Sequence, residues 1–286
     1  MIVIVGSMVV LGCVLAGFTL SGGHIGALIH PAEILTIGGA SLGALIMMSP
    51  KKVLGDLVRG LLQSLKGAAF SKEAYRELFG VLYELLSVAR RDGLLGLESH
   101  ISDPHQSPIF NKYPRIAHNH HVVDFICGAL SPVIEGTANA EQLEALLEIE
   151  LKVLEEEHHA PISVLSKTAD ALPGFGIVAA VLGIVITMGA IDGPVEEIGH
   201  KVGAALVGTF LGILASYGFF GPLAGRMEFQ GAAELAFFRT IAAAVLGSVR
   251  DLPPKVAIEQ ARRGVSSEMR PMRQELDEMF RAAEAA

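Results

Sequence analysis

Two long stretches of the chain contain no acidic or basic side chain. They cover residues 172–190 and 202–224, and neither holds an Asp, Glu, Lys, Arg or His. Each is close to the ~20 residues that an α-helix needs to cross a bilayer core of about 30 Å. A protein that moves ions through a bilayer usually keeps an ionisable residue there, because such a group is costly and is retained for use. The chain therefore either does not conduct ions or depends on a partner for the carboxylate.

Two further apolar runs lie near the N-terminus. Residues 2–22 carry no charge, and residues 32–48 carry only Glu33, at the edge of the run. The first run has no Lys or Arg before it and is longer than the apolar core of a typical signal peptide, so we expect a retained span. A mean hydropathy of +0.49 with 18% charged residues indicates large water-exposed parts beside the four spans.

Basic residues predict the orientation, because Lys and Arg accumulate in cytoplasmic segments. The link within the first pair of spans, residues 21–31, has none, and the link within the second pair, residues 191–201, has only Lys201. The parts before and after the second pair are rich in both. We therefore predict an all-α integral membrane protein with four transmembrane helices, a large helical cytoplasmic loop and a cytoplasmic C-terminal helical tail.

This topology predicts four parts. Residues 1–50 form a transmembrane hairpin of spans one and two, and residues 51–171 form a helical cytoplasmic domain. Residues 172–224 form the second transmembrane hairpin, and residues 225–286 form cytoplasmic C-terminal helices. Both termini are expected on the cytoplasmic side.

The spacing of apolar residues predicts two helices in the cytoplasmic loop. Ser71 can cap a helix whose leucines recur at three- and four-residue steps up to Gly93, which weakens or ends it. Residues 141–157 form a second helix that is expected to run towards span three. A stretch rich in turn residues, 100–114, separates the two.

The tail after span four is also predicted to be helical. Residues 234–249 are apolar enough to be packed, and Pro253 with Pro254 should end that helix. Residues 268–283 are expected to form a charged, exposed helix.

Several classes of function are disfavoured. A net charge of −8 argues against nucleic acid as a partner. Cys13 lies in a span and Cys127 in the cytoplasmic part, so a disulfide between them is implausible. His118, His120 and His121 are treated as exposed surface rather than as a metal site. No nucleophile–base pair or phosphate loop occurs, so we expect no enzymatic role and no cofactor.

Small residues are dense in the predicted spans. In lipid, such residues allow helix backbones to approach closely. They suit either a compact four-helix bundle or faces that also pack against other copies and a partner helix, and we favour the second. The positions are Gly38, Gly39, Ala40, Ser41, Gly43 and Ala44 in span two, Gly176, Ala179, Ala180 and Gly183 in span three, and Gly203, Gly208, Gly212 and Ala215 in span four.

Four separated motifs carry a family resemblance. They are FNKYPRI (residues 110–116), LPGFGIVAAVLGIV (172–185), VGTFLGILASYGFFGPL (207–223) and PPKVAIEQARR (253–263). In this order, and with this number and pairing of spans, the chain resembles the MotA/PomA family of flagellar stator proteins. The resemblance implies a protein of the bacterial inner membrane, in which five copies surround a dimer of a single-span, peptidoglycan-anchored partner of the MotB or PomB type. In that family the partner contributes an Asp, and ion passage past it turns the pentamer against the rotor.

Two residues of span three bear on ion coupling. Pro173 stands at the start of the predicted span, where a proline is tolerated because its missing N–H has no helical partner. The resemblance adds that this proline lies beside the partner's Asp and couples protonation to movement. Ala180 is seven residues on and lies on nearly the same helix face. Family members driven by Na⁺ tend to have a hydroxyl residue here, so Ala180 favours H⁺ as the translocated ion.

Three further positions match the family's pathway. Thr209 matches a pathway threonine, although a threonine in a membrane helix commonly bonds back to its own helix. Asp170 either caps span three or draws ions along the exit path, and the cap is favoured. Pro222 is expected to end span four, while the resemblance gives it a role in coupling to the rotor.

Arg90 and Glu98 lie in the segment ARRDGLLGLE. Taken alone, they are charges on a solvated helix end. The resemblance implies that a basic and an acidic residue at this spacing meet opposite charges on FliG, the switch protein of the rotor's C-ring. Arg91 is adjacent and could share or replace the role of Arg90.

The sequence disfavours two other classes of membrane protein. An energiser of the ExbB/TolQ type would use a similar pentamer, but such chains usually have three spans, with one before the cytoplasmic loop. A stand-alone channel or transporter should show internal ionisable residues or broken helices paired between repeats. Neither feature is present in the sequence.

Overall fold

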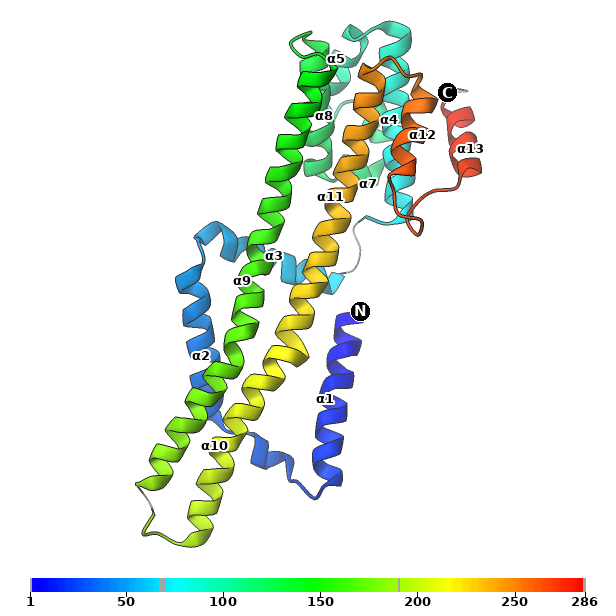
Figure 1. The fold of residues 1–286 in the computed structure, drawn as a ribbon. Helices are drawn as coiled ribbons and strands as arrows, with labels where there is room; N and C mark the ends of the chain where they lie inside the picture. The colour runs from blue at the N-terminus through cyan, green and yellow to red at the C-terminus, as the bar shows by residue number, and fades with distance from the viewer. Residues whose placement is uncertain (1, 67–69, 190, 285–286) are drawn as a thin grey trace. The chain divides into compact units, whose positions relative to one another are not determined.

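The computed structural model describes residues 2–66, 70–189 and 191–284, and the regular elements in these ranges are all helices (Figure 1). The predicted all-α fold is therefore confirmed. In chain order the elements are α1 (Ile2–Leu20), the 3₁₀ turn η1 (Ile25–Leu28), α2 (Pro31–Met48), α3 (Lys51–Lys66), α4 (Lys72–Asp92), α5 (Leu95–Ser102), α6 (Pro108–Asn111), α7 (Pro114–Ala117), α8 (His120–Ile134), α9 (Ala140–Met188), α10 (Val195–Ala215), the π-helical turn η2 (Ser216–Phe220), α11 (Gly221–Val249), α12 (Pro254–Arg263) and α13 (Arg273–Glu284).

Four segments are long and apolar enough to cross a membrane, which confirms the four predicted spans. They are Ile2–Leu20, Ile25–Met48, and the apolar parts of Ala140–Met188 and Val195–Val249. Ala190, the last residue of the predicted third span, lies outside the described residues. The third and fourth spans belong to much longer helical segments, which continue beyond the apolar residues.

The prediction that span three begins a helix at Pro173 is wrong. Pro173 and Asp170 both lie inside α9, a continuous helix of 49 residues. Asp170 therefore caps no helix, and Pro173 does not occupy a first turn. A proline removes one backbone hydrogen bond locally, but packing on either side can hold the helix together, and membrane helices tolerate such interruptions. The helix predicted for residues 141–157 is confirmed, and it runs directly into the span.

Pro222 does not end span four either. It is the second residue of α11, which continues to Val249. The turn before it, η2, is π-helical, and the N–H of Gly221 donates to the carbonyl of Ser216, five residues earlier. A π-turn is one of the local adjustments by which a membrane helix accommodates a proline, whose ring would otherwise clash with a carbonyl one turn back.

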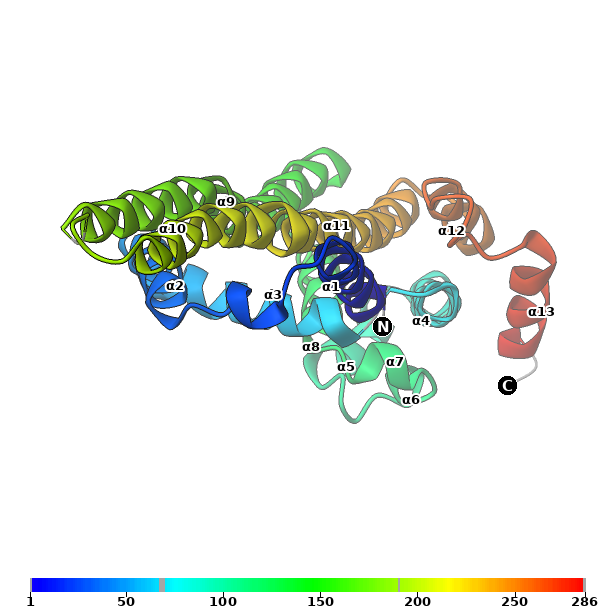
Figure 2. The same ribbon diagram turned by 90° about the horizontal axis from the view of Figure 1, so that it is seen from below.

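The chain divides into two compact units. Within the described residues, the first contains α1 to α3 with residues 157–230, and the second contains α4 to α8 with residues 140–156 and 231–284. In the first unit α10 packs on α2, and α1 packs on η2 and α3. α9 and α10 lie side by side in both ribbon views (Figures 1 and 2). The spans are therefore grouped in a single unit.

The second unit has a large apolar core around α4. The Ser71 side chain accepts a hydrogen bond from the N–H of Ala74, and Gly93 at φ +79° follows the last turn of α4, as predicted. The predicted packing of residues 234–249 is confirmed as well, because α11 supplies buried core residues. The largest fully buried core residues are Leu78, Phe79, Leu82, Leu85, Leu86, Leu97, Phe110, Ile116, Ile126, Leu143, Phe237 and Phe238.

Two predictions for the second unit were incomplete. The turn-rich stretch contains α6 and parts of α5 and α7, and the 15-residue α8 beyond it was not predicted. The tail helix begins at Arg273 rather than at residue 268, because Pro271 interrupts the backbone before it. It is also not fully exposed: Phe280 is buried and its ring centroid lies 4.2 Å from that of Tyr83 on α4.

Candidate functional site

The first unit, which contains the four spans, is organised around a close contact between α9 and α10. A Cβ atom placed on Gly212 would lie 2.6 Å from the carbonyl oxygen of Leu172 and 2.9 Å from the Cα of Gly176. A Cβ atom on Gly183 would lie 2.7 Å from the Cβ of Ala205. Any larger residue would push these backbones apart, so the glycines set the spacing of spans three and four.

This contact brings together two of the residues that the sequence singled out. A Cβ on Gly176 would lie 3.2 Å from the Cα of Thr209, and a Cβ on Gly208 would lie 3.4 Å from the backbone N of Ala180. Thr209 and Ala180 therefore flank the same glycine contact. Pro173 lies two helical turns before Ala180 on the continuous helix α9, and so near the same face.

The other two predicted pathway residues lie differently. Asp170 is exposed and stands one turn before Pro173 on α9, just outside the charge-free stretch. Pro222 is exposed and follows the π-helical turn η2. Neither belongs to the glycine contact itself.

The hydroxyl of Thr209 differs from those of the other threonines. The chain has seven threonines, and six of them donate a side-chain hydrogen bond to a backbone carbonyl within five residues. Among the described residues, Thr209 makes no such bond, although it is half-buried. The back-bonded alternative is therefore not observed. Its hydroxyl remains able to donate to, and accept from, another group.

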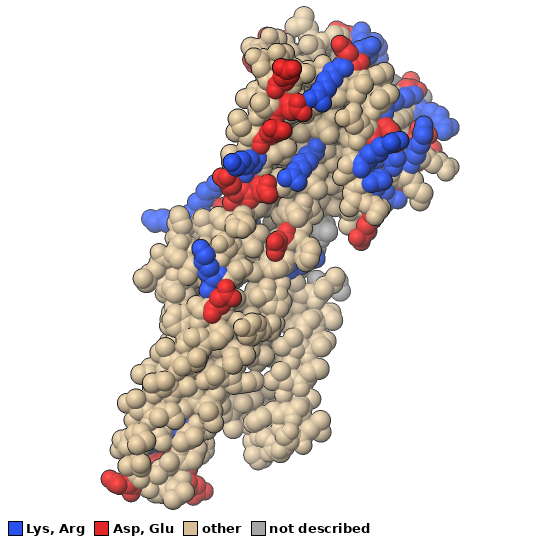
Figure 3. All heavy atoms as spheres, in the orientation of Figure 1, with Lys and Arg blue, Asp and Glu red and all other residues tan. Residues whose placement is uncertain are grey.

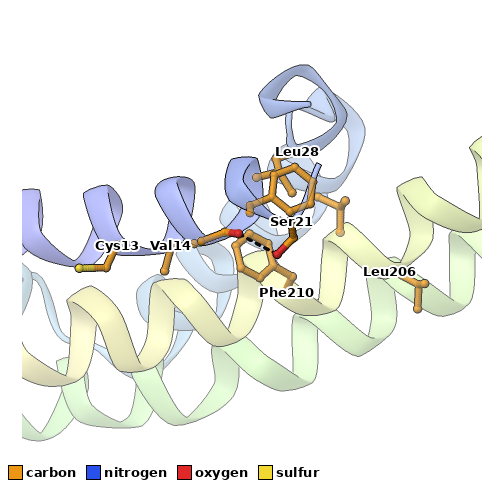
Figure 4. A pocket seen from close by; sticks show the side chains of 9 residues that line it. Cys13, Val14, Ser21, Leu28, Leu206 and Phe210 are labelled. Carbon is orange, nitrogen blue, oxygen red and sulfur yellow. Dashed lines mark hydrogen bonds between the residues drawn. The ribbon is translucent and has the colours of Figure 1, made fainter. Parts of the chain in front are cut away.

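A cavity of about 510 Å³ lies between α1 and α10 in the first unit (Figure 4). The hydroxyl of Ser21 donates to the carbonyl of Gly17, at 3.0 Å, so its polar group is already satisfied. This groove is apolar and offers no ligand set for an ion. Its lining residues are Cys13, Val14, Gly17, Phe18, Ser21, Leu28, Leu206, Val207 and Phe210.

The proposed rotor contacts lie at the junction of α4 and α5. Arg90 is in the last turn of α4 and its guanidinium is 3.8 Å from the carboxylate of Asp251. Arg91 instead donates three hydrogen bonds to the carboxylate of the neighbouring Asp92, at 3.0, 3.1 and 3.2 Å. Glu98 is exposed in the first turn of α5. The charge of Arg91 is therefore matched locally, whereas that of Arg90 is held only loosely.

The FNKYPRI motif packs against helix α4. The hydroxyl of Tyr113 donates to Glu84 on α4 at 2.8 Å, and Lys112 contacts the other oxygen of the same carboxylate at 2.7 Å. Burial and the nearby carboxylate both raise the pKa of Tyr113, so the phenol stays protonated and remains a donor. Phe110 is fully buried. The motif therefore acts in packing, and sequence reasoning gave it no such role.

The charged residues avoid the spans. In Figure 3 the surface over the apolar part of the first unit shows neutral atoms, and acidic side chains gather at the tip of the α9–α10 hairpin. No group of three or more His, Cys, Asp or Glu that could hold a metal ion occurs in the described part of the chain. His118, His120 and His121 are exposed, as predicted.

Comparison with known proteins adds family relationships. Residues 4–93 match the model "Motility protein A N-terminal", and residues 117–240 match "MotA/TolQ/ExbB proton channel family". The chain is 36% identical to Motility protein A of Salmonella typhimurium over 282 residues, covering 99% of this chain and 96% of the relative. It is 39% identical to the chemotaxis protein LafT of Vibrio parahaemolyticus, covering 93% of each.

Two solved structures have similar folds. The structure of the flagellar MotAB stator complex from Bacillus subtilis gives a TM-score of 0.72 at 26% identity, covering 90% of this chain and 92% of that one. The structure of C. jejuni MotAB gives a TM-score of 0.77 at 22% identity, covering 93% and 96%. The second of these bears on the fold alone.

Proposed function

The chain belongs to the MotA family of flagellar stator proteins, and from this premise we propose that it forms a proton channel with a MotB-type partner and drives the flagellar rotor. The family is one of proton channels rather than of enzymes. The observation that carries the proposal is the α9–α10 contact, in which Ala180 and the unbonded Thr209 lie together in a part of the chain without Asp, Glu, Lys, Arg or His.

Spans three and four of this chain lack a carboxylate that could hold a proton, so a partner has to supply it. Proton transfer through a bilayer needs a group that can hold the proton, and an intramembrane carboxylate is the usual choice. Because residues 172–190 and 202–224 lack one, we propose that a single-span partner of the MotB type, anchored to peptidoglycan and present as a dimer, supplies an Asp. The relative from Bacillus subtilis is part of a complex named MotAB, which supports this choice.

The ion is proposed to be H⁺. A Na⁺ that loses its water needs several oxygen ligands to replace it. Ala180 offers no side-chain oxygen, so it does not suit Na⁺. The hydroxyl of Thr209, by contrast, can pass a proton through water because it both donates and accepts. Pro173 lies on the Ala180 face of α9 and is proposed to couple protonation of the partner's carboxylate to movement of the helix.

The assembly and its orientation are also proposals. We propose five copies of the chain around the partner dimer, with residues 51–171 and 225–286 in the cytoplasm and the two hairpin tips outside. The excess of Lys and Arg in those two segments supports this orientation. Arg90 and Glu98 would then reach FliG on the rotor, with Arg91 as a secondary contact. Pro222 and Asp170 would lie near the cytoplasmic end of the ion path.

The test is a clean deletion of the gene in its own host. We expect paralysed cells that carry a normal number of filaments, counted by electron microscopy, because rotor assembly is intact while energisation is lost. A plasmid copy of the wild-type gene should restore swimming. Cells that swim normally in a strain shown to hold no second stator would contradict the proposal and revive the ExbB/TolQ alternative.

A further inference from the structure

Helix α3 presents two different faces. Two residues separate it from the end of α2, and it lies crosswise to α9 and α11 in the first unit (Figure 1). Leu57 is buried in a cluster with residues of α9 and α11, including Leu165 and Met227. The hydroxyl of Ser64 donates to the side-chain oxygen of Gln230 at 2.7 Å. This inner face accounts for how α3 is held in place.

The second face is apolar and exposed. Val58 and Leu62 are 57% and 55% exposed, although large aliphatic side chains are normally buried. They are four residues apart, so they lie one above the other on the helix. Packing inside the chain therefore does not explain this row.

Basic residues border the exposed row. α3 contains Lys51, Lys52, Arg59 and Lys66, but its one acidic residue is Asp56. Lys52 pairs with Glu157 and Arg59 contacts Asp56 at 3.4 Å. Among the described residues, Lys51 and Lys66 have no ion pair. The helix therefore carries a surplus of positive charge.

The contacts of α3 place it at the edge of the apolar spans. The α9 residue that it covers, Leu165, lies two residues before Lys167, which is followed by Asp170 before the charge-free stretch begins. The α11 residue Met227 lies between Arg226 and Glu228, the first charges after span four. A helix at that level meets the boundary between acyl chains and headgroups, where amphipathic helices with basic polar faces bind.

We propose that α3 is a binding surface for anionic phospholipid. Val58 and Leu62 enter the boundary of the acyl chains, while Lys51, Arg59 and Lys66 contact the phosphate groups. The occupant is chosen by charge, because a basic surface next to an apolar row complements an anionic headgroup attached to an acyl chain. This proposal does not depend on the stator function.

The absence of tryptophan from the chain allows a direct test. The full-length variant Leu62→Trp carries a single indole, and it is reconstituted in phosphatidylcholine vesicles. The vesicles contain a small, equal fraction of either dibrominated phosphatidylglycerol or dibrominated phosphatidylcholine as quencher. We expect quenching by the anionic lipid to be stronger by roughly twofold or more, because basic residues enrich it locally. Val58→Trp tests the same face and guards against a folding defect in one variant.

Two controls define the outcomes. Leu20→Trp places the indole on an 89% exposed residue at the end of α1, where the following link has no Lys or Arg, and both lipids should quench it equally. Adding K51Q, R59Q and K66Q to L62W should abolish the preference. Equal quenching of L62W by the two lipids would overturn the anionic-lipid assignment. Absence of quenching by either lipid, in both L62W and V58W, would mean that protein covers the face and would also overturn it.

Discussion

Gly176 on α9 and Gly212 on α10 pack backbone against backbone, so that a methyl group on Gly212 would come within 2.9 Å of the Gly176 Cα. We expect Gly212→Ala to separate the two helices and to destabilise the protein by about 1–3 kcal/mol, the usual cost of overpacking. The midpoint of thermal unfolding in detergent should fall, and swimming should be impaired because Thr209 moves away from α9.

Gly203 gives a matched control on the same helix. A Cβ there would meet no heavy atom within 4 Å. Gly203→Ala should therefore leave stability unchanged or raise it slightly, since alanine is the better helix former by about 1 kcal/mol. If both variants unfolded at the same temperature as the wild type, the glycine contact would not set the helix spacing.

The hydroxyl of Thr209 supplies the second prediction. Thr209→Val keeps the shape of the side chain but removes its donor and acceptor, so we expect swimming speed to fall by roughly half or more if protons pass through it. Thr209→Ser should retain most of the speed. The thermal midpoint should change little in either variant, because this hydroxyl makes no hydrogen bond within the described chain.

Thr187 serves as the control for that experiment. Its hydroxyl donates to the carbonyl of Gly183 in its own helix at 2.8 Å. Thr187→Val removes a threonine hydroxyl from span three, eleven residues beyond the Gly176 contact with Thr209, and so leaves the proposed path untouched. Equal swimming defects in T187V and T209V would show a general effect of losing a hydroxyl and would remove Thr209 from the path.

The positions of the spans were predictable, but their ends were not. The lack of charge over residues 172–190 and 202–224 is a strong signal of a membrane segment, and it depends on composition alone. Helix ends were inferred from Pro173 and Pro222, because proline usually interrupts helices in water. In this chain a continuous helix and a π-helical turn absorb them. Local residue preference was overridden by tertiary packing.

The candidate site was predictable as a set of residues but not as a geometry. The density of small residues in spans three and four indicated close packing, yet Gly203 and Gly212 look equivalent in the sequence. Only the structure shows that one has a backbone neighbour and the other has open space. The unbonded state of Thr209 was equally hidden, because the other threonines bond back to nearby carbonyls.

The charged residues at the end of α4 lead to a third prediction. Arg91 is neutralised by Asp92, whereas Arg90 is 3.8 Å from an exposed partner, Asp251. Like charges across an interface cost several kcal/mol, so reversing a residue that contacts the rotor should reduce torque. Because Arg90 is the less tightly paired of the two, we expect Arg90→Glu to reduce torque far more than Arg91→Glu. Glu98→Lys should act as Arg90→Glu does, and R90E combined with a compensating charge reversal on FliG should recover torque.

The measurement is the torque of tethered cells, with membrane insertion checked by immunoblotting. Asp251→Asn is the matched control, because asparagine tolerates the φ of +62° at this position but does not pair with Arg90. That variant should keep normal torque. If R91E proved the more severe of the two reversals, Arg91 would be the rotor contact.

The fourth prediction concerns Glu259 on α12, in the motif PPKVAIEQARR. Its carboxylate accepts two hydrogen bonds from Arg262, at 2.7 and 2.8 Å, and one from Arg263 at 3.1 Å. Arg262 also donates to the carbonyl of Pro271 at 3.0 Å, which ties α12 to the turn before α13. These bonds lower the pKa of Glu259 to about 2.

The sign of the pH dependence follows from that lowered pKa. Since the native carboxyl binds its proton less readily than the unfolded one, its contribution to stability is present above the ordinary value of 4.5 and is lost as the pH falls towards 2. We expect Glu259→Gln to destabilise the protein by about 1–2 kcal/mol at pH 7. The gap between the thermal midpoints of E259Q and wild type should narrow at pH 3. Arg263→Gln is the control, because Arg263 makes one exposed contact and should matter little. A gap that stayed constant from pH 7 to pH 3 would mean that Glu259 acts through packing rather than through its charge.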